Sequence, residues 1–227
     1  MKVKLIKKQN ETKDIITFTF EPEKKFNWIA GQYIILTIDH KEPDNRGKMR
    51  FFTISSAPFQ KNPSITTRIN QDESSSFKKA LTALEIGNEI DAKGPDGDFI
   101  IDDLNKKYIF IIKGVGITPF ISIIKQLTYE NKKIDGLLLY INKDEIAFEN
   151  ELREILKKQS KLRLINLKNL DDTKSYILKN FKNNISKHDF YVSGASIMTL
   201  ETEKFLDNLG VEKDNQKLDY FSGYKNN

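Results

Sequence analysis

The spacing of apolar residues changes once along the 227-residue chain, near residues 101–107, and this change constrains the fold most strongly. Before it, short runs rich in β-branched and aromatic residues are separated by turn residues, which is typical of an antiparallel sheet. After it, continuous apolar runs alternate with segments of helical periodicity, which is typical of a parallel sheet covered by helices. We therefore expect two domains, residues 1–103 and 104–227.

The first domain is predicted to be a small antiparallel β-barrel with one short helix. The strands are expected at 2–9, 15–20, 33–38, 51–54 and 65–69. The helix is expected over 74–84, where Phe77, Leu81 and Leu84 recur at helical spacing. The sequence Gly-Pro-Asp-Gly at 94–97 predicts a turn, and the polar residues 41–48 a mobile hairpin tip.

The second domain is predicted to be a doubly wound α/β domain, because strand and helix patterns alternate along it. Strands are expected at 108–112, 137–140, 162–167 and 190–192, and helices at 117–129, 148–157, 173–181 and 197–209. The first strand and helix are joined by Gly114-Val115-Gly116-Ile117-Thr118-Pro119. The N-terminus of a helix presents unpaired N–H groups that favour an anion. This turn is therefore expected to hold a phosphate, although a plain tight turn fits the same residues.

Two more strand ends are expected at the same edge of the parallel sheet. Beyond residue 140, Lys143 suits a 2′-phosphate, whereas Asp144 or Glu145 suits a ribose 2′-hydroxyl. The two interpretations favour opposite nucleotides, and a solvated loop fits equally well. After the fourth strand, Gly194 lets a ligand approach the backbone beside Ser193, or simply begins the next helix.

Composition excludes several kinds of site and partner. These residues include no cysteine, so they form no disulfide, thiolate zinc site, cysteine nucleophile or cysteine-ligated iron–sulfur cluster. No metal site is predicted, because neither histidine has a ligating partner at useful spacing. The net charge of +5, with both signs interspersed, predicts a polar surface and no nucleic-acid partner. Without a signal peptide or a stretch of ~20 apolar residues, a cytoplasmic protein with no membrane insertion is expected.

The sequence Arg50-Phe51-Phe52-Thr53 places a cation, two rings and a hydroxyl on one expected strand. Alternate residues of a strand share a face, so Arg50 and Phe52 are expected on one side and Thr53 on the other, unless a twist or bulge intervenes. On these residues alone, core aromatics beside one surface arginine is the favoured interpretation.

Segments along nearly the whole chain, taken in order, resemble the ferredoxin–NADP reductase family. They are Gly31-Gln32-Tyr33, Arg50-Phe51-Phe52-Thr53, Ser74-Ser75-Ser76-Phe77, Gly94-Pro95-Asp96-Gly97-Asp98-Phe99, the turn 114–119, Ser193-Gly194 with Met198, and Asp219-Tyr220-Phe221-Ser222-Gly223-Tyr224. Three residues depart from the family pattern. Phe52 replaces a tyrosine, Ser193 replaces the cysteine of many members, and Ala195 replaces a proline.

The resemblance implies FAD in the first domain. Arg50 would contact the FAD pyrophosphate, Phe52, beside Phe51, would stack against the flavin, and Thr53 would bond near the flavin N5. The serine helix start gives the pyrophosphate a second place, which favours FAD over FMN. The further residues implied on this side are Thr67, Arg68 and Ile69 along the adenine-side strand, and Ser74, Ser75 and Ser76 at the pyrophosphate.

The resemblance also implies NADH or NADPH in the second domain, with Ser193 and Gly194 near the nicotinamide. The other residues implied to hold the nucleotide are Gly114, Gly116, Thr118, Pro119 and Lys143. Phe221 or Tyr224 would cover the other face of the flavin. A C-terminal strand packing on the sheet fits those two aromatic residues as well.

The activity implied by the resemblance is that of a flavin-dependent NAD(P)H oxidoreductase, with Thr53 and Ser193 as its catalytic residues. A hydride would pass from the nicotinamide to flavin N5, and the electrons would then pass to a separate acceptor. A ferredoxin or flavodoxin would suit the basic charge, and a free flavin, a quinone or a ferric chelate is the alternative. Two other interpretations stay open: an electron-transfer or regulatory subunit without turnover of its own, and a chain that binds neither cofactor.

Overall fold

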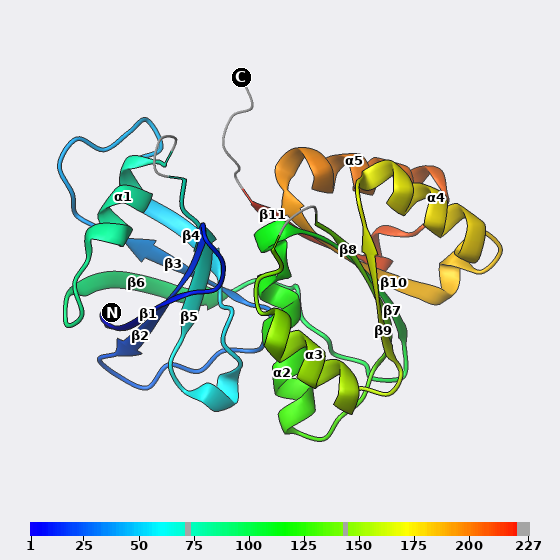
Figure 1. Ribbon diagram of the computed structural model, residues 1–227, viewed down its shortest axis with the longest axis horizontal. Coiled ribbons are helices and arrows are strands. Elements are labelled where there is room, and N and C mark those ends of the chain that lie inside the picture. Colours follow the sequence, from blue (N-terminus) through cyan, green and yellow to red (C-terminus); the bar gives the residue numbers. More distant parts are fainter. Residues whose placement is uncertain (71–73, 143–144, 222–227) are drawn as a thin grey trace.

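The first half of the chain forms a nearly closed antiparallel barrel. The computed structural model describes residues 1–70, 74–142 and 145–221, and in these residues six strands pair in the order β4-β3-β6-β1-β2-β5. They are β1 (Lys2–Asn10), β2 (Ile15–Pro22), β3 (Tyr33–Thr37), β4 (Met49–Thr53), β5 (Ser64–Arg68) and β6 (Glu89–Asp96). An isolated antiparallel bridge between Ile54 and Ile65 links the two outer strands. The predicted antiparallel barrel is confirmed (Figure 1).

Strand β6 corrects the prediction of a turn at 94–97. The strand continues through Gly94 to Asp96, and Asp96 pairs with Tyr33 of β3. Gly94 has φ +119°, a conformation that side-chain-bearing residues rarely adopt. Pairing with distant β3 therefore overrides the local turn signal. The predicted short helix is present as α1 (Ser76–Ala83).

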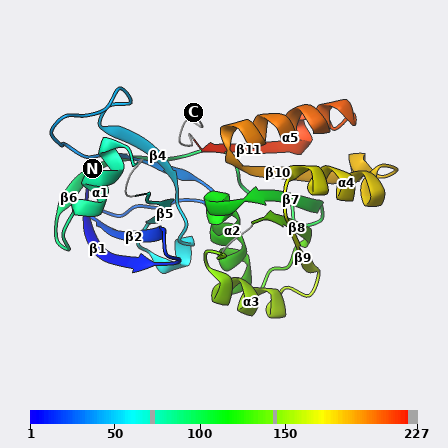
Figure 2. The same ribbon diagram turned by 45° about the horizontal axis from the view of Figure 1, so that its top comes forward.

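The second half forms a parallel sheet in the order β11-β10-β7-β8-β9, covered by helices on both faces. Its strands are β7 (Lys107–Lys113), β8 (Asp135–Ile141), β9 (Leu162–Leu167), β10 (His188–Ala195) and β11 (Gln216–Phe221). Its helices are α2 (Ile117–Tyr129), α3 (Glu149–Lys158), α4 (Leu170–Phe181) and α5 (Ser196–Asn208). Helices α2 and α3 lie on one face, and α4 and α5 on the other (Figures 1 and 2).

The central strand β7 explains why both faces must be covered. Tyr108, Phe110 and Ile112 pack into the core beneath α2 and α3, whereas Ile109 and Ile111 pack beneath α4 and α5. Because alternate side chains point to opposite faces, this continuous apolar run needs a helical layer on each side. The predicted doubly wound domain is confirmed. The C-terminal strand that the sequence left as an alternative is observed as β11, parallel to β10.

Contacts between α2 and the barrel fix how the two halves meet. The buried Ser122 hydroxyl donates to the carbonyl of Ser56 at 2.7 Å. The Phe59 N–H donates to Gln126 Oε1 at 3.0 Å, and the Phe59 ring stacks on Tyr129 with centroids 4.2 Å apart. The carboxyl end of β11 also lies beside the barrel (Figure 1), where Asp219 accepts a hydrogen bond from Thr53. No helix in the described part of the chain is long and apolar enough to span a membrane.

Candidate functional site

Strand β4 presents Arg50 and Phe52 on one face, as the alternation predicts. Both contact Phe77 of α1: the Arg50 guanidinium carbon lies 5.3 Å from the ring centroid, and the Phe52 ring centroid lies 5.7 Å from it. Phe51 is 58% exposed and packs edge-on against Tyr33. Phe52 is buried in the barrel core, so its ring is held by packing on Phe77.

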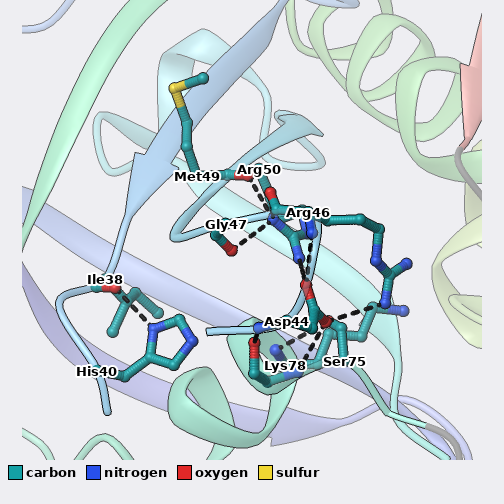
Figure 3. Close-up of polar contacts among 10 residues, drawn as sticks. Ile38, His40, Asp44, Arg46, Gly47, Met49, Arg50, Ser75 and Lys78 are labelled. Atoms are coloured by element: carbon teal, nitrogen blue, oxygen red, sulfur yellow. Dashed lines mark hydrogen bonds and ion pairs between the residues drawn. The ribbon is translucent and has the colours of Figure 1, made fainter. Parts of the chain in front are cut away.

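The N-terminus of α1 and the Arg50 side chain converge on one carboxylate. Arg50 Nη2 donates to Asp44 Oδ1 at 3.0 Å, and the Ser76 N–H donates to Asp44 Oδ2 at 3.1 Å (Figure 3 shows Asp44 with Arg50). Ser75 is the N-cap, and its hydroxyl accepts from the Lys78 N–H at 3.2 Å. Ser74, just before it, is buried. The place where a cation meets a helix N-terminus therefore holds an anionic group of the chain itself.

The carboxyl end of β5 is tied to its neighbours. The Arg68 guanidinium forms an ion pair with Asp14, and the Arg68 carbonyl accepts from Lys78 Nζ at 2.8 Å. The Ile69 N–H donates to the carbonyl of Asp14 at 2.7 Å, while Thr67 is buried within the strand. The structure thus places these three residues at the barrel edge nearest α1 and the β1–β2 hairpin.

The turn before α2 contains two glycines, one with a positive φ and one without room for a Cβ. Gly114 has φ +55°, and a Cβ there would meet only the Arg68 guanidinium, at 3.9 Å. Gly116 lies against β10, where a Cβ would come within 2.4 Å of the Ser193 carbonyl oxygen. The Tyr140 hydroxyl donates to the Gly114 carbonyl at 3.0 Å, which ties the end of β8 to this turn. Gly116 is therefore required by chain packing, while Gly114 leaves one side of the turn open.

Two hydroxyls at this edge have no hydrogen-bond partner among the described residues. They are Thr118 Oγ1, in the first turn of α2 beside the buried Pro119, and Ser193 Oγ, on β10 just before Gly194. Both residues are fully buried. Buried hydroxyls are nearly always paired, so two unpaired ones at the carboxyl edge of a parallel sheet indicate a place for a ligand.

A hydrogen bond across the domain junction joins this edge to the barrel. The Thr53 hydroxyl donates to Asp219 Oδ2 at 2.7 Å, from the end of β4 to β11. Asp219 pairs in register with Ser193 on the neighbouring strand. Burial raises the pKa of Asp219 to about 6, while the bond from Thr53 opposes this rise. The carboxyl therefore changes charge near neutral pH, next to the two residues predicted to be catalytic.

Sequence reasoning missed Asp219 and Asp44. Asp219 lies in a segment quoted for its aromatic residues, and a lone carboxylate there carries no local signal of its partner 166 positions away. Asp44 lies in the loop 41–48, which the sequence predicts to be a mobile hairpin tip but which is bonded to the start of α1. The sequence around Asp44 carries no signal of its contacts with Arg50 and Ser76.

The remaining predicted residues lie at the edge of this site or outside the described chain. Phe221 ends β11, and its carbonyl accepts from the Ser196 hydroxyl at 3.1 Å. Lys143 and Tyr224 lie outside the described residues, so their predicted roles stay predictions. Within the described ranges, no group of three or more histidine, aspartate or glutamate side chains is placed to hold a metal ion.

Two family models match the chain, one in each half. Residues 2–101 match the oxidoreductase FAD-binding domain, and residues 110–204 match the oxidoreductase NAD-binding domain.

Curated relatives resemble it over roughly two thirds of its length. Flavohemoprotein from Bacillus subtilis is 30% identical over 67% of this chain and 39% of that protein. The glycine betaine monooxygenase reductase subunit of Chromohalobacter salexigens is 31% identical over 71% of this chain and 45% of that protein. The 3-ketosteroid-9-alpha-monooxygenase ferredoxin reductase component of Rhodococcus rhodochrous is 31% identical over 65% and 43%. The chain thus spans less than half the length of these relatives.

Solved structures share the two-domain fold. Ferredoxin-NADP+ reductase from Plasmodium falciparum superposes with a TM-score of 0.78 at 20% identity, covering 97% of this chain and 95% of that one. The FAD/NAD-binding domain of nitric oxide dioxygenase from Vibrio cholerae gives a TM-score of 0.75 at 20% identity, covering 97% and 98%. With its paired FAD-binding and NAD-binding domains, the chain has the two-domain fold of ferredoxin-NADP+ reductase and belongs to the flavin-dependent NAD(P)H oxidoreductases, whose cofactors are FAD and NAD(P)H.

Proposed function

We propose that this chain takes a hydride from NADH or NADPH onto FAD at the domain junction and passes the electrons to an acceptor outside these residues. The observation that carries the proposal is the hydrogen bond from Thr53 to Asp219. It joins the motif strand of the FAD-binding half to the last described strand of the NAD-binding half. The bond supports the proposal because Thr53, one of the two residues proposed to be catalytic, lies where the two halves meet.

The barrel side fits the phosphates of FAD. Arg50 and the Ser76 N–H already bind a carboxylate, and the same kinds of donor bind phosphate oxygens. Ser74 and Ser75 lie beside them at the start of α1. These residues support a pyrophosphate site, with Thr67, Arg68 and Ile69 along the neighbouring strand.

The parallel-sheet side fits a nicotinamide nucleotide. A buried polar group without a partner costs about 1–3 kcal/mol, so a ligand that pairs with Thr118 Oγ1 and Ser193 Oγ regains that free energy. The open side of Gly114 leaves room for a phosphate at the turn before α2. Both hydroxyls are fully buried in this structure, so nucleotide binding would have to move the chain around them to reach them.

In this proposal, the charge of Asp219 decides where the proton of the Thr53 hydroxyl points. Bound FAD supplies the hydride acceptor. While Asp219 is ionised, the Thr53 hydroxyl donates to it, and Thr53 Oγ1 is left able to accept a hydrogen bond on its other side. Once Asp219 is protonated, the Thr53 hydrogen is free to point elsewhere. The pair thus sets the hydrogen-bonding character of Thr53, while Ser193 positions the nicotinamide.

A protein acceptor is favoured by the relatives. Two of them are named as the reductase subunit or component of a monooxygenase, and a net charge of +5 suits an acidic carrier such as a ferredoxin or flavodoxin. A free flavin, a quinone or a ferric chelate is the alternative acceptor. We also propose a cytoplasmic location and a domain division at 103/104.

The second candidate is an electron-transfer subunit that turns over only within a larger complex. The printed name of the Chromohalobacter relative, a reductase subunit, favours it. FAD binding by itself does not separate the two candidates.

Steady-state turnover separates them. The FAD-loaded chain alone is mixed with NADH or NADPH and ferricyanide as the acceptor. We expect sustained oxidation of one coenzyme. Bound FAD without turnover would favour the obligate subunit, and failure to bind FAD at all would contradict both candidates.

A further inference from the structure

The loop between β3 and β4 is fastened to the start of α1 by a reciprocal pair of hydrogen bonds. The Asp44 N–H donates to Ser76 Oγ at 2.9 Å, and the Ser76 N–H donates to Asp44 Oδ2 at 3.1 Å. The two residues are 32 positions apart, so the contact is a tertiary one that covers a helix N-terminus.

The same loop uses the hydrogen-bonding capacity of Arg50. Arg50 Nη1 donates to the carbonyls of Arg46, Gly47 and Met49 at 2.8, 2.9 and 2.7 Å, and Nη2 donates to Asp44 Oδ1 at 3.0 Å (Figure 3). The guanidinium also lies over the Phe77 ring. Its side chain is only 17% exposed, so little of it faces solvent.

Both oxygens of Asp44 are occupied. Oδ1 accepts from the Arg46 N–H and from Arg50 Nη2, each at 3.0 Å, and Oδ2 accepts from the Ser76 N–H and from Arg46 Nη2. Burial raises the pKa of Asp44, but the Arg46 and Ser76 N–H groups and the Arg46 charge outweigh burial and hold that pKa below its ordinary value. Asp44 is therefore a charged carboxylate at neutral pH.

A phosphate and this carboxylate need the same donors. A guanidinium and a helix N-terminal N–H together form a site for either kind of anion. The Asp44 carboxylate already holds both, and a second anion placed beside it would be repelled by its charge. An FAD pyrophosphate can use the Arg50 and Ser76 donors fully only after Asp44 leaves them.

We propose that Asp44 is a built-in competitor of the FAD pyrophosphate, and that residues 39–48 form a latch that must open when FAD binds. The inference rests on the proposed function, because it takes Arg50 as the pyrophosphate ligand. In the FAD-free chain, the latch keeps Arg50 paired and the start of α1 satisfied. It also makes FAD binding an exchange of one anion for another, which lowers the affinity and slows association.

The test is an FAD titration of the full chain freed of flavin, with FAD fluorescence quenching as the readout and stopped-flow mixing for the association rate. Asp44→Asn keeps the size of the side chain and removes its charge. We expect its FAD dissociation constant to fall at least about fivefold and its association rate to rise by a similar factor. Asp39→Asn is the matched control, because Asp39 lies in the same loop with its side chain 93% exposed. We expect that variant to behave as wild type.

A second probe, inorganic pyrophosphate, tests the same donors without the flavin. It should raise the melting temperature of Asp44→Asn more than that of the wild type or of Asp39→Asn. Equal or weaker FAD binding by a folded Asp44→Asn variant would overturn the inference and make Asp44 a residue that positions Arg50, while the proposed function would stand. Failure of the wild type and the variant alike to bind FAD would overturn both.

Hydrogen exchange of the wild-type chain keeps the inference testable if Asp44→Asn does not fold. The Asp44 and Arg46 amides are expected to exchange faster when FAD is bound, because the latch has opened, while the amides of α1 stay protected. Slower exchange of the loop on FAD binding would overturn the latch.

Discussion

The polar groups at the N-termini of α1 and α2 are paired in opposite ways. At α1, the Ser76 N–H and the Arg50 guanidinium are satisfied by Asp44 of the same chain. At α2, no side chain caps the helix, and the buried Thr118 and Ser193 hydroxyls lack partners among the described residues. A ligand at the first place must exchange with an anion already bound, whereas a ligand at the second meets unpaired groups. The chain therefore pairs the donors at its barrel site with a carboxylate of its own, and leaves two hydroxyls at the nucleotide site unpaired among the described residues.

Removing the cation at the first place has the largest expected effect. Arg50→Ala should weaken FAD binding by about 100-fold, because charge-assisted hydrogen bonds contribute about 1.5–3 kcal/mol each and 1.4 kcal/mol corresponds to a factor of ten. Fluorescence titration measures the change, with circular dichroism to check the fold. Lys48→Ala is the control, since the ion pair of Lys48 among the described residues is with the exposed Asp39. Unchanged FAD affinity in Arg50→Ala would mean that the pyrophosphate lies elsewhere.

The pH dependence of stability tests the junction. Asp219 has a folded-state pKa raised to about 6 from its ordinary 3.8, so the folded chain holds this proton more tightly than the unfolded chain. Its contribution to stability is complete below about pH 4 and is lost as the pH rises through 6.

Asp219→Asn isolates this contribution. The full shift corresponds to about 3 kcal/mol at about 1.4 kcal/mol per pKa unit, and partial exposure reduces it to about 2 kcal/mol. Urea unfolding at pH 4, 5, 6 and 7 should show the wild type losing about this much relative to Asp219→Asn. Parallel curves for the two proteins would show that Asp219 is not buried as the structure has it.

Thr53→Val keeps the shape of the side chain and removes the hydroxyl that bonds Asp219. We expect hydride transfer to slow about tenfold, since a positioned hydrogen-bonding group contributes a step of at least this size. Flavin affinity should change little. Stopped-flow reduction of the FAD-loaded variant measures the rate, and Thr37→Val, at the end of β3, is the control. A normal rate in Thr53→Val would remove Thr53 from the reaction.

Ser193→Ala gives the smallest expected effect. Whether it raises or lowers the stability tests the contrast between the N-termini of α1 and α2. Ser193 Oγ is buried and has no partner among the described residues. Removing it should therefore leave the free energy of unfolding unchanged or raise it by about 1 kcal/mol at most, and the melting temperature should stay the same or rise slightly. Hydride transfer should fall only a few-fold. A clear loss of stability would mean that the chain itself uses this hydroxyl, and the contrast with α1 would then fail.

The fold could be predicted where a pattern is local. The helical spacing of Ile117 to Tyr129 and the strand predicted from Leu162 to Leu167 gave α2 and β9 with their observed bounds. The turn predicted at 94–97 failed because pairing with β3 extends β6 through that segment. Whether such a segment forms a strand depends on pairing with a distant strand, and the Gly-Pro-Asp-Gly sequence gives no local signal of that pairing.

The site could be predicted only in part. The turn 114–119 joins the expected strand and helix, and Arg50 and Phe52 share the expected face. Asp219 and Asp44 could not be predicted, because each acts through a partner that is remote in sequence. A carboxylate in a loop or on an alternating strand is ordinarily a solvated one. Their importance follows from burial and from which donors they occupy.

The most direct measurement is anaerobic titration of the FAD-loaded chain with NADH and, separately, NADPH, while the visible absorption band of the flavin is followed. We predict that one coenzyme bleaches the band stoichiometrically, and that Thr53→Val slows the bleaching without changing its end point. A flavin that stays oxidised with both coenzymes would contradict hydride transfer at the junction of Thr53, Asp219 and Ser193.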